Sequence, residues 1–469
     1  MPAPLRLAAM LTCLALGPGA ALAQAGDEAP GSPEAPGSPE TIAGDNNSPA
    51  NGTLRIQITD GVTRPTILAI EPFEVVEPFE TGNDAGELAA QVVGVIAENL
   101  TGTGLFTRTT ENLPEPAGFD VPVVYDDWYA SRAEALVTGA VSADADRVSI
   151  RFRLFDVLAG QPMGDGMQFD TARTDWRRAA HKAADQIYMR LTGETGLFDS
   201  RIAFVSETGP RERREKRIGI MDVDGQNVKW MTDGTALVLA PSFSPDGRRL
   251  VYISFGSGQP RLMMMDVASV QARPVGSTQG MAFAPRWSPD GRWIVYSRET
   301  AGNSDIWLLD PATGDERALT NDPAIDTAPD FSPDGTQIVF ESDRSGSQQL
   351  YVMPADGGEA RRITFGEGSY ASPAWSPKGD LIAFTKIEGD RYHIGTMRPN
   401  GNGERLLTQS FLDEGPSWAP NGRVVIFTRE TLGADGRSRL HSVDVTGRNM
   451  RALTMQGEAS DPSWGPLLP

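Results

Sequence analysis

The chain has 469 residues, a formal net charge of −20 at pH 7 and a single cysteine. This length allows two domains with additional segments. The acidic balance argues against nucleic-acid binding, which needs lysine and arginine side chains to contact phosphate. It suits instead a soluble protein that meets basic or neutral protein partners.

Residues 1–23 are typical of a cleaved export signal. The apolar run Leu7–Leu16 is followed by the helix-breaking segment Gly17-Pro18-Gly19 and by the cleavage motif Ala21-Leu22-Ala23. No later stretch is long enough to span a bilayer, so we expect no transmembrane segment in the mature chain. Cys13 lies inside this signal, so the exported protein has neither disulfide nor thiol chemistry.

Residues 24–52 are rich in Pro, Gly, Ser and Glu. The hexad Ala29–Glu34 is repeated as Ala35–Glu40. A segment of this composition cannot bury enough apolar surface to form a core. We expect a disordered tether between the signal and the first domain.

Residues 53–193 contain no repeat and predict a small α/β domain. Two helices are expected, over Ala85–Leu100 and Asp175–Leu191. Asp84 and Glu87 have the spacing of a capping box for the first helix, and Thr174 and Gly193 are candidate caps of the second. The expected strands are Leu54–Thr59, Thr66–Ile70, Ala135–Ala143, Val148–Leu158 and Met167–Thr171.

A short linker, 194–200, leads to residues 201–469, where one phrase recurs at a nearly constant spacing. It reads Phe243-Ser244-Pro245-Asp246-Gly247 at its first occurrence and fades at Trp464-Gly465-Pro466. The intervening copies begin at Trp287, Phe331, Trp375 and Trp418. The prolines are 44, 44, 44, 43 and 46 residues apart, a period typical of four-stranded propeller blades.

The phrase itself encodes a tight turn, because Pro presets φ, Asp suits the bridge region and Gly accepts a positive φ. We therefore interpret Pro245, Asp246, Gly247 and their equivalents as architectural. An aromatic residue follows each glycine by five positions and should pack between blades: Tyr252, Tyr296, Phe340, Phe384 and Phe427.

The register differs at the two ends of the repeat region. Arg201–Val205 matches a second strand without a preceding turn phrase, and Pro462–Pro466 matches a first strand without a successor. Pairing the two would close the ring and cover its exposed edges. The fold class is therefore multidomain, an α/β domain followed by an all-β, WD40-like propeller of six blades closed by the C-terminal strand.

The two ends of this propeller differ in sequence. The Pro-Asp-Gly turns at one end repeat, whereas the loops at the other end vary from blade to blade, and we name the latter the variable end. Specific recognition needs varied side chains, and function concentrates on such loops. The candidate partner-binding residues at the variable end are Asp326, Thr327, Arg344, Tyr370, Asp413 and Glu414.

The sequence does not predict an enzyme. The three histidines, His181, His393 and His441, have no metal-ligand spacing, and neither a nucleophile elbow nor a phosphate-binding loop is present. The carboxylates near the blade ends could hold a cation in the channel or form a solvated acidic rim. We expect no catalytic residue, cofactor site or metal site.

Two stretches carry a more specific resemblance. They are Leu54–Val62, which leads to Ile70-Glu71-Pro72-Phe73, and Ser410–Ser417. With the export signal, the α/β domain and the propeller, the chain over 53–469 resembles the TolB family of periplasmic propellers of the Tol-Pal system.

The resemblance implies a non-enzymatic scaffold that is located in the periplasm and is monomeric when free. It implies binding of the peptidoglycan-associated lipoprotein through the propeller, where the family's loop matches Asp326-Thr327-Ala328-Pro329. It implies binding of TolA through the N-terminal segment, for which Leu54, Arg55 and Ile56 are candidates. In the family the TolA-binding segment lies close to the mature N-terminus, whereas here residues 24–52 precede it, so either the tether carries the TolA contact or the contact begins further along the chain. Such a scaffold supports outer-membrane integrity and envelope constriction at division.

Two other functions remain open from the sequence. A propeller that gates a hydrolase would need a catalytic domain, and residues 53–193 contain no nucleophile elbow. A propeller that binds sugar or cell wall would need no further domain.

Overall fold

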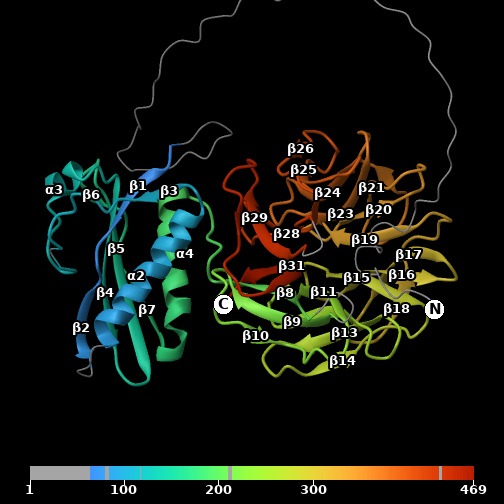
Figure 1. The fold of residues 1–469 in the computed structure, drawn as a ribbon, viewed down its shortest axis with the longest axis horizontal. Helices are drawn as coiled ribbons and strands as arrows, with labels where there is room; N and C mark the ends of the chain where they lie inside the picture. Colours follow the sequence, from blue (N-terminus) through green and yellow to red (C-terminus); the bar gives the residue numbers. More distant parts are fainter. Residues whose placement is uncertain (1–63, 80–83, 117, 210–213, 433–435) are drawn as a thin grey trace, which may run out of the picture. The chain divides into compact units, whose positions relative to one another are not determined.

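Figure 1 shows the computed structural model, which describes residues 64–79, 84–116, 118–209, 214–432 and 436–469. The described residues all fall within one compact unit, Leu54–Pro469. They form a mixed α/β domain and a six-bladed β-propeller, which confirms the predicted fold class. No helix in this part of the chain is long and apolar enough to cross a bilayer. The predicted export signal, the tether and the strand Leu54–Thr59 lie outside the described residues.

The α/β domain is one seven-stranded sheet with two long helices packed side by side on it (Figure 1). Its central strands follow the order β3-β1-β4-β5-β6, and β2 and β7 pair with β4 and β5. The strands are β1 (Thr66–Ile70), β2 (Glu74–Phe79), β3 (Phe106–Arg108), β4 (Ala135–Ala143), β5 (Arg147–Asp156), β6 (Gln161–Pro162) and β7 (Met167–Ala172). The helices are α2 (Asp84–Gly102), α3 (Tyr125–Ala130), the 3-10 turn η1 (Arg173–Asp175) and α4 (Trp176–Thr192).

The apolar side of helix α2 faces this domain's core. Val92 and Ile96 of α2 are fully buried in one cluster with Phe152 of β5. Helix α4 ends as predicted at Gly193, which has φ 76° and donates its N–H to the carbonyl of Met189. The prediction of Thr174 as the helix cap is wrong. It lies within η1, and α4 begins after Asp175 without a side-chain cap.

The propeller consists of six four-stranded antiparallel sheets, numbered here as blades 1 to 6. Blade 1 contains β8 (Ser200–Thr208), β9 (Glu215–Asp222), β10 (Lys229–Trp230) and β31 (Glu458–Leu467). Blade 2 contains β11 (Val238–Phe243), β12 (Arg249–Ser254), β13 (Arg261–Asp266) and β14 (Ala272–Pro274). Blade 3 contains β15 (Met281–Trp287), β16 (Ile294–Thr300), β17 (Asn303–Leu309) and β18 (Glu316–Ala318).

The remaining blades repeat this order. Blade 4 contains β19 (Asp326–Phe331), β20 (Gln337–Ser342), β21 (Gln349–Pro354) and β22 (Arg361–Arg362). Blade 5 contains β23 (Ser369–Trp375), β24 (Ile382–Glu388), β25 (Arg391–Met397) and β26 (Arg405–Leu406). Blade 6 contains β27 (Leu412–Trp418), β28 (Val424–Glu430), β29 (Ser438–Asp444) and β30 (Arg451–Ala452).

The ring closes where the sequence predicts it. The last strand, β31, pairs antiparallel with β8, which is the first strand of the propeller in chain order. The Trp464 indole N–H donates to the Ser200 hydroxyl at 2.9 Å across this pair. The C-terminal segment therefore supplies the innermost strand that blade 1 lacks.

The Ser-Pro-Asp-Gly phrase forms the hairpin between the first two strands of a blade. In blade 2 the Ser244 hydroxyl donates to the Asp246 carboxylate at 2.5 Å and accepts the Arg249 N–H at 2.9 Å. Gly247 has φ 67° and donates its N–H to the Ser244 carbonyl. Ser and Asp thus satisfy the groups of their own turn, which confirms the architectural interpretation of this phrase.

The aromatic residue after each turn packs between blades, as predicted. Phe384 on blade 5 is fully buried against Val339 and Leu350 of blade 4. Tyr252 on blade 2 packs in the same way against Val205 of blade 1. The blades therefore share apolar side chains around the whole ring.

The α/β domain contacts the Pro-Asp-Gly end of the propeller. Two turns that depart from the repeated phrase contact the 194–200 linker that follows this domain. Lys378 of blade 5 lies 3.4 Å from the Glu194 carboxylate, and Asn421 of blade 6 donates to the Thr195 carbonyl at 3.2 Å. The turns that replace aspartate therefore contact the linker that follows the α/β domain, while the variable end lies on the opposite side of the ring.

Replacing Phe384 by alanine should leave a cavity between blades 4 and 5 and lower the free energy of unfolding by about 3–5 kcal/mol. The matched control is Phe365→Ala, because that side chain is 75% exposed and should cost less than about 0.5 kcal/mol. The midpoint of urea unfolding, followed by tryptophan fluorescence, measures both effects. Equal losses of stability in the two variants would contradict the inter-blade packing.

Candidate partner-binding site

The candidate residues of the variable end are distributed over three adjacent blades. They occupy the starts of innermost strands or the loops beside them. Blade 4 supplies Asp326 and Thr327 on β19 and Arg344 on the β20–β21 loop, blade 5 supplies Tyr370 on β23, and blade 6 supplies Asp413 and Glu414 on β27.

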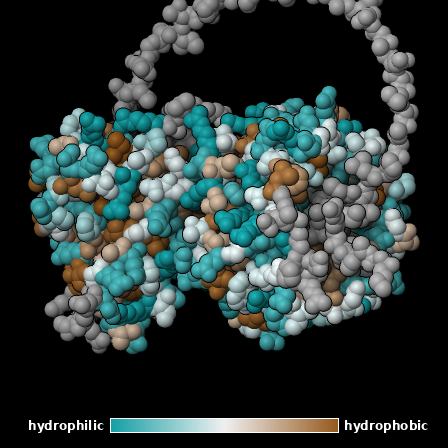
Figure 2. Space-filling model, in the orientation of Figure 1, coloured by the Kyte–Doolittle hydropathy of each residue, from teal (hydrophilic) through white to brown (hydrophobic). Residues whose placement is uncertain are grey.

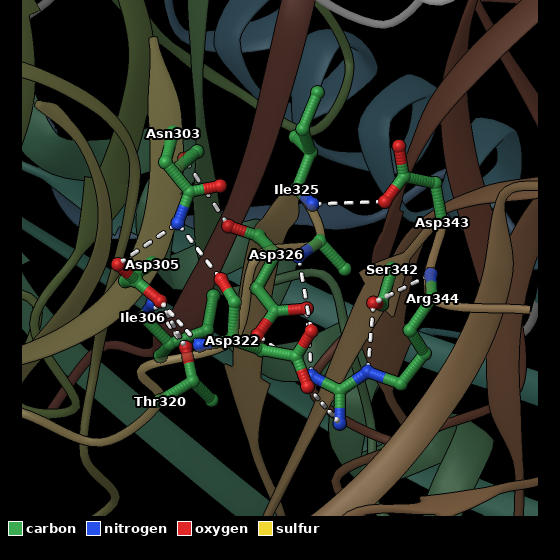
Figure 3. Close-up of polar contacts among 12 residues, drawn as sticks. Asn303, Asp305, Ile306, Thr320, Asp322, Ile325, Asp326, Ser342, Asp343 and Arg344 are labelled. Atoms are coloured by element: carbon green, nitrogen blue, oxygen red, sulfur yellow. Dashed lines mark hydrogen bonds and ion pairs between the residues drawn. The ribbon is translucent and has the colours of Figure 1, made fainter. Parts of the chain in front are cut away.

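Asp326 and Arg344 form a buried ion pair at the variable end (Figure 3). One terminal nitrogen of Arg344 donates to both Asp326 carboxylate oxygens at 2.7 and 2.8 Å, while its Nε donates to the Ser342 hydroxyl. Burial raises the pKa of the Asp326 carboxyl, against the opposing effect of the Ser342 and Arg344 hydrogen bonds. The carboxylate is fully buried, so it anchors the Arg344 loop to the first residue of β19.

The loops around this pair are held by further hydrogen bonds (Figure 3). The Ile325 N–H donates to the Asp343 carboxylate at 2.8 Å, which joins the blade 3–4 connection to the β20–β21 loop. Asn303 donates to the Asp322 carbonyl at 2.8 Å from the other side. Hydrogen bonds therefore join the loops of blades 3 and 4 at the variable end.

Blade 6 repeats the same arrangement with a different arginine. Asp413 is fully buried and accepts hydrogen bonds from Arg429 Nε at 2.7 Å and Nη2 at 2.6 Å. The Thr408 hydroxyl also donates to Asp413 at 2.6 Å. Asp413 therefore holds the connection between blades 5 and 6 against β28.

Tyr370 occupies the corresponding position of blade 5 and is also fully buried. Its hydroxyl donates to the Glu404 carboxylate at 2.8 Å, and Lys386 pairs with the same carboxylate at 3.0 Å. Burial is the largest cause that raises the pKa of Tyr370 to about 12, followed by the Glu404 hydrogen bond. Tyr370 is therefore a neutral structural donor.

Thr327 and Glu414 are partly exposed. The Thr327 hydroxyl donates to Glu341 at 2.6 Å, and the other oxygen of Glu341 accepts the Ser372 N–H of blade 5 at 2.8 Å. The surroundings of the Glu414 carboxyl favour its neutral form. Burial, followed by the nearby carboxylates of Asp461 and Glu430, raises its pKa to about 7.

All six innermost strands share a bulge that the sequence analysis missed. Each has one residue with φ between 45° and 63° at the register shift of the strand: Ala240, Ala284, Ala328, Ser372, Gly415 and Asp461. Five are not glycine, although the left-handed region costs an L-residue about 1–2 kcal/mol. The N–H groups of four of them donate to side chains of neighbouring blades, as in Ala328 to Ser297 at 3.0 Å and Asp461 to Thr428 at 3.1 Å.

A second proline follows each of these residues and lies four positions before the proline of the turn phrase. This recurrence was a visible signal of a feature within the strand, since proline is confined to bulges and edges of sheets. The bulges re-aim the strand ends that carry Thr327 and Glu414.

The structure thus gives the predicted residues two different environments. Asp326, Tyr370 and Asp413 are buried and engaged internally, whereas Thr327, Arg344 and Glu414 retain partial exposure. Leu54, Arg55 and Ile56 lie outside the described residues. Within the described part of the chain, the blade-end carboxylates do not gather into a three-residue metal-binding group.

The sequence analysis also missed a set of exposed apolar side chains on the variable loops. They are Ile325, Phe365, Phe411 and Leu432, with exposed fractions of 36, 75, 44 and 73%. Large apolar residues in otherwise polar, non-repeating loops were the signal that could have found them. Figure 2 shows that apolar residues are otherwise scattered among hydrophilic ones on the face that it displays.

Comparison with known proteins decides the family. The model of the "TolB beta propeller domain" matches residues 188–468, and the model of the "TolB amino-terminal domain" matches residues 54–163. The chain belongs to the TolB family. TolB is a non-enzymatic component of the Tol-Pal system, so the predicted family and the absence of an enzymatic role are confirmed.

Similar TolB proteins match over nearly their whole length. The Tol-Pal system protein TolB of Roseobacter denitrificans is 55% identical over 420 residues, which cover 89% of this chain and 94% of the relative. TolB of Zymomonas mobilis is 56% identical over 420 residues, which cover 89% and 91%. The crystal structure of TolB from Acinetobacter baumannii superposes with a TM-score of 0.76 at 29% identity, covering 88% of this chain and all of that one.

Glu414 should make stability depend on pH. Its folded pKa of about 7 lies above the ordinary value of 4.5, so the folded state binds the proton more tightly. This contribution is present below about pH 4.5 and is lost as the pH rises through 7, by up to about 3 kcal/mol. Glu414→Gln should therefore be more stable than the unmodified protein at pH 8 and nearly equal to it at pH 4.

Thermal unfolding of both proteins across this pH range measures the difference. Glu367→Gln is the control, because Glu367 is an exposed glutamate on another variable loop. A constant difference between Glu414→Gln and the unmodified protein at every pH would exclude the raised pKa.

Proposed function

We propose that this TolB-family protein is a periplasmic scaffold that binds the peptidoglycan-associated lipoprotein with the variable end of its propeller. It binds TolA with its N-terminal segment, and the two contacts together support outer-membrane integrity and envelope constriction at division. We also propose that the α/β domain spans residues 53–193 and that the propeller spans residues 201–469. The observation that carries the proposed function is the contrast between the propeller's two ends.

The Pro-Asp-Gly end presents few varied side chains that a specific partner could recognise. Its turns repeat, and those of blades 5 and 6 contact the 194–200 linker through Lys378 and Asn421. The variable end instead presents exposed apolar side chains beside fixed charges. Protein interfaces combine such an apolar centre with a polar rim.

The exposed apolar side chains are Phe365 and Phe411 on the blade 4–5 and 5–6 connections, Ile325 on the blade 3–4 connection and Leu432 on the β28–β29 loop. Exposed aromatic anchors are the residue type that contributes most to binding free energy when a partner buries them. Thr327 and Arg344 would lie on the polar rim. The buried residues Asp326, Tyr370 and Asp413 would act indirectly, by fixing the loops before the partner arrives, which lowers the entropic cost of binding.

Phe365→Ala and Leu432→Ala should each weaken binding of the lipoprotein's soluble domain by about 5- to 30-fold, which corresponds to about 1–2 kcal/mol. Titration calorimetry with the purified lipoprotein domain measures the dissociation constants. Leu158→Ala is the matched control, because this leucine is 55% exposed on the α/β domain.

Unchanged affinity in both variants, with a tight complex for the unmodified protein, would place the interface elsewhere. No complex at all would contradict the proposed function. Sedimentation of the protein with peptidoglycan in the absence of lipoprotein would favour a cell-wall-binding propeller instead.

Two truncations separate the tether from the TolA contact. If Leu54, Arg55 and Ile56 make that contact, a protein that begins at residue 53 should retain TolA binding, and one that begins at residue 61 should lose it. Affinity capture on immobilised TolA measures both. Loss of binding in the longer protein would assign the contact to the tether, and retention in the shorter one would exclude Leu54–Ile56.

A further inference from the structure

A histidine and two aspartates from distant parts of the chain meet between α4 and blade 1, away from the variable end. They are His181 of α4, Asp222 at the end of β9 and Asp224 in the following turn. One possible ligand atom of each lies within 4.8 Å of the others. This is the single group of this kind among the described residues.

His181 is the residue that makes the cluster unusual. Its side chain is 2% exposed, and its Nε2 atom has no hydrogen-bond partner. That atom lies 3.6 Å from Oδ2 of Asp224, which is also without a hydrogen bond. A buried Nε2 atom without a hydrogen bond is costly unless something binds it, whereas Oδ2 of Asp224 has the Arg177 guanidinium as an ion-pair partner.

The other atoms of these residues are already engaged in ways that orient the cluster. Nδ2 of Asn99 on α2 lies 2.7 Å from Nδ1 of His181. A 180° turn of this amide exchanges its nitrogen and oxygen, and the oxygen would then accept the Nδ1 proton and leave the Nε2 lone pair for a metal ion. Oδ1 of Asp224 accepts the Gln226 N–H at 3.1 Å, which points Oδ2 toward His181. Asn227 donates to one oxygen of Asp222 at 2.7 Å.

Blade 1 differs from the other blades at this turn. In blades 2, 3 and 6 the aspartate that ends the third strand accepts the N–H groups of its own turn: Asp266 from Ser269, Asp310 from Ala312 and Asp444 from Thr446. In blade 1 the N–H of the turn, that of Gln226, is accepted by Asp224 instead. The preceding Asp222 is therefore not needed to cap the turn.

We propose that His181, Asp222 and Asp224 form a binding site for a divalent transition-metal ion, with Zn²⁺ as the best match. One imidazole nitrogen and two carboxylate oxygens are ligands that zinc accepts, and water would complete a tetrahedral shell. Nε2 of His181 is the ring nitrogen without a hydrogen-bond partner, and it faces the Asp224 carboxylate, so it is the ligand atom that the imidazole would offer.

Access and competition also bear on the site. The side chains of Asp222 and Asp224 are 15% and 10% exposed, so solvent reaches the cluster from the aspartate side. Arg201 lies 4.0 Å from Oδ1 of Asp222. Arg177 lies 3.3 Å from Oδ2 of Asp224 and is the nearer of these two competing cations. Removing that guanidinium should therefore strengthen metal binding. A bound ion would join α4 to blade 1, a role independent of partner binding at the variable end.

The test uses the whole purified protein after treatment with a chelator. Addition of Co²⁺ should produce the visible absorption band of a tetrahedral site, and Zn²⁺ should displace it. Asp224→Asn should abolish the band or weaken binding by more than about tenfold. The amide oxygen of this variant can still accept the Gln226 N–H, so the turn should survive. His181→Ala should have the same effect, and Arg177→Ala should bind the ion more tightly.

His441→Ala is the matched control, since His441 lies on β29 outside the cluster. Thermal unfolding gives a second readout, because an ion that binds only the folded state raises the melting temperature of the unmodified protein and not that of Asp224→Asn. Absence of a tetrahedral band in the unmodified protein would overturn the proposal. A band that persists in both His181→Ala and Asp224→Asn would overturn it equally.

Discussion

The pairing of β31 with β8 is the interaction on which the propeller depends. Without it blade 1 would lack its innermost strand, and both β8 and the neighbouring blade 2 would expose unpaired surface toward the channel. Because the two strands come from opposite ends of the repeat region, this contact forms only when the whole ring is assembled. The aromatic packing between blades then becomes continuous, and each blade supports the next.

The closed ring gives the variable end its rigidity. Every innermost strand carries a bulge in the left-handed region, and this backbone strain persists because neighbouring blades supply hydrogen bonds to the bulges. The buried pairs Asp326–Arg344 and Asp413–Arg429 then fix individual loops. The binding surface is thus formed before a partner arrives. Its exposed apolar side chains are carried by loops whose rearrangement would break buried ion pairs and hydrogen bonds.

The repeat architecture could be predicted from the sequence because its signals are local. Proline and glycine at a constant spacing specify turns, and a strand without a partner at each end specifies closure. The environment of the site could not be predicted in this way. Asp326 is buried because Arg344, 18 residues away, folds back over it, and this depends on the conformation of a loop. The proximity of His181 to Asp224 depends similarly on how the α/β domain packs against blade 1.

Two copies of the turn phrase depart from the repeat, and their position is informative. Lys378 and Asn421 replace the aspartate of the turn phrase, and both contact the segment that follows α4. In a repeat protein each copy is under the same folding constraint, so a copy that breaks the pattern has usually acquired a neighbour. Where a sequence has one regular phrase, its exceptions can therefore indicate which repeats carry a second domain.

The strand β31 has a mechanical consequence beyond closing the ring. Near its start, Glu458 pairs with Arg214 at the variable end, and beyond its last residue the carbonyl of Pro469 accepts a hydrogen bond from Arg178 on α4. A ten-residue strand extends about 33 Å and resists stretching along its axis. A force applied to the variable loops of blade 1 would therefore be transmitted to α4 along one continuous strand.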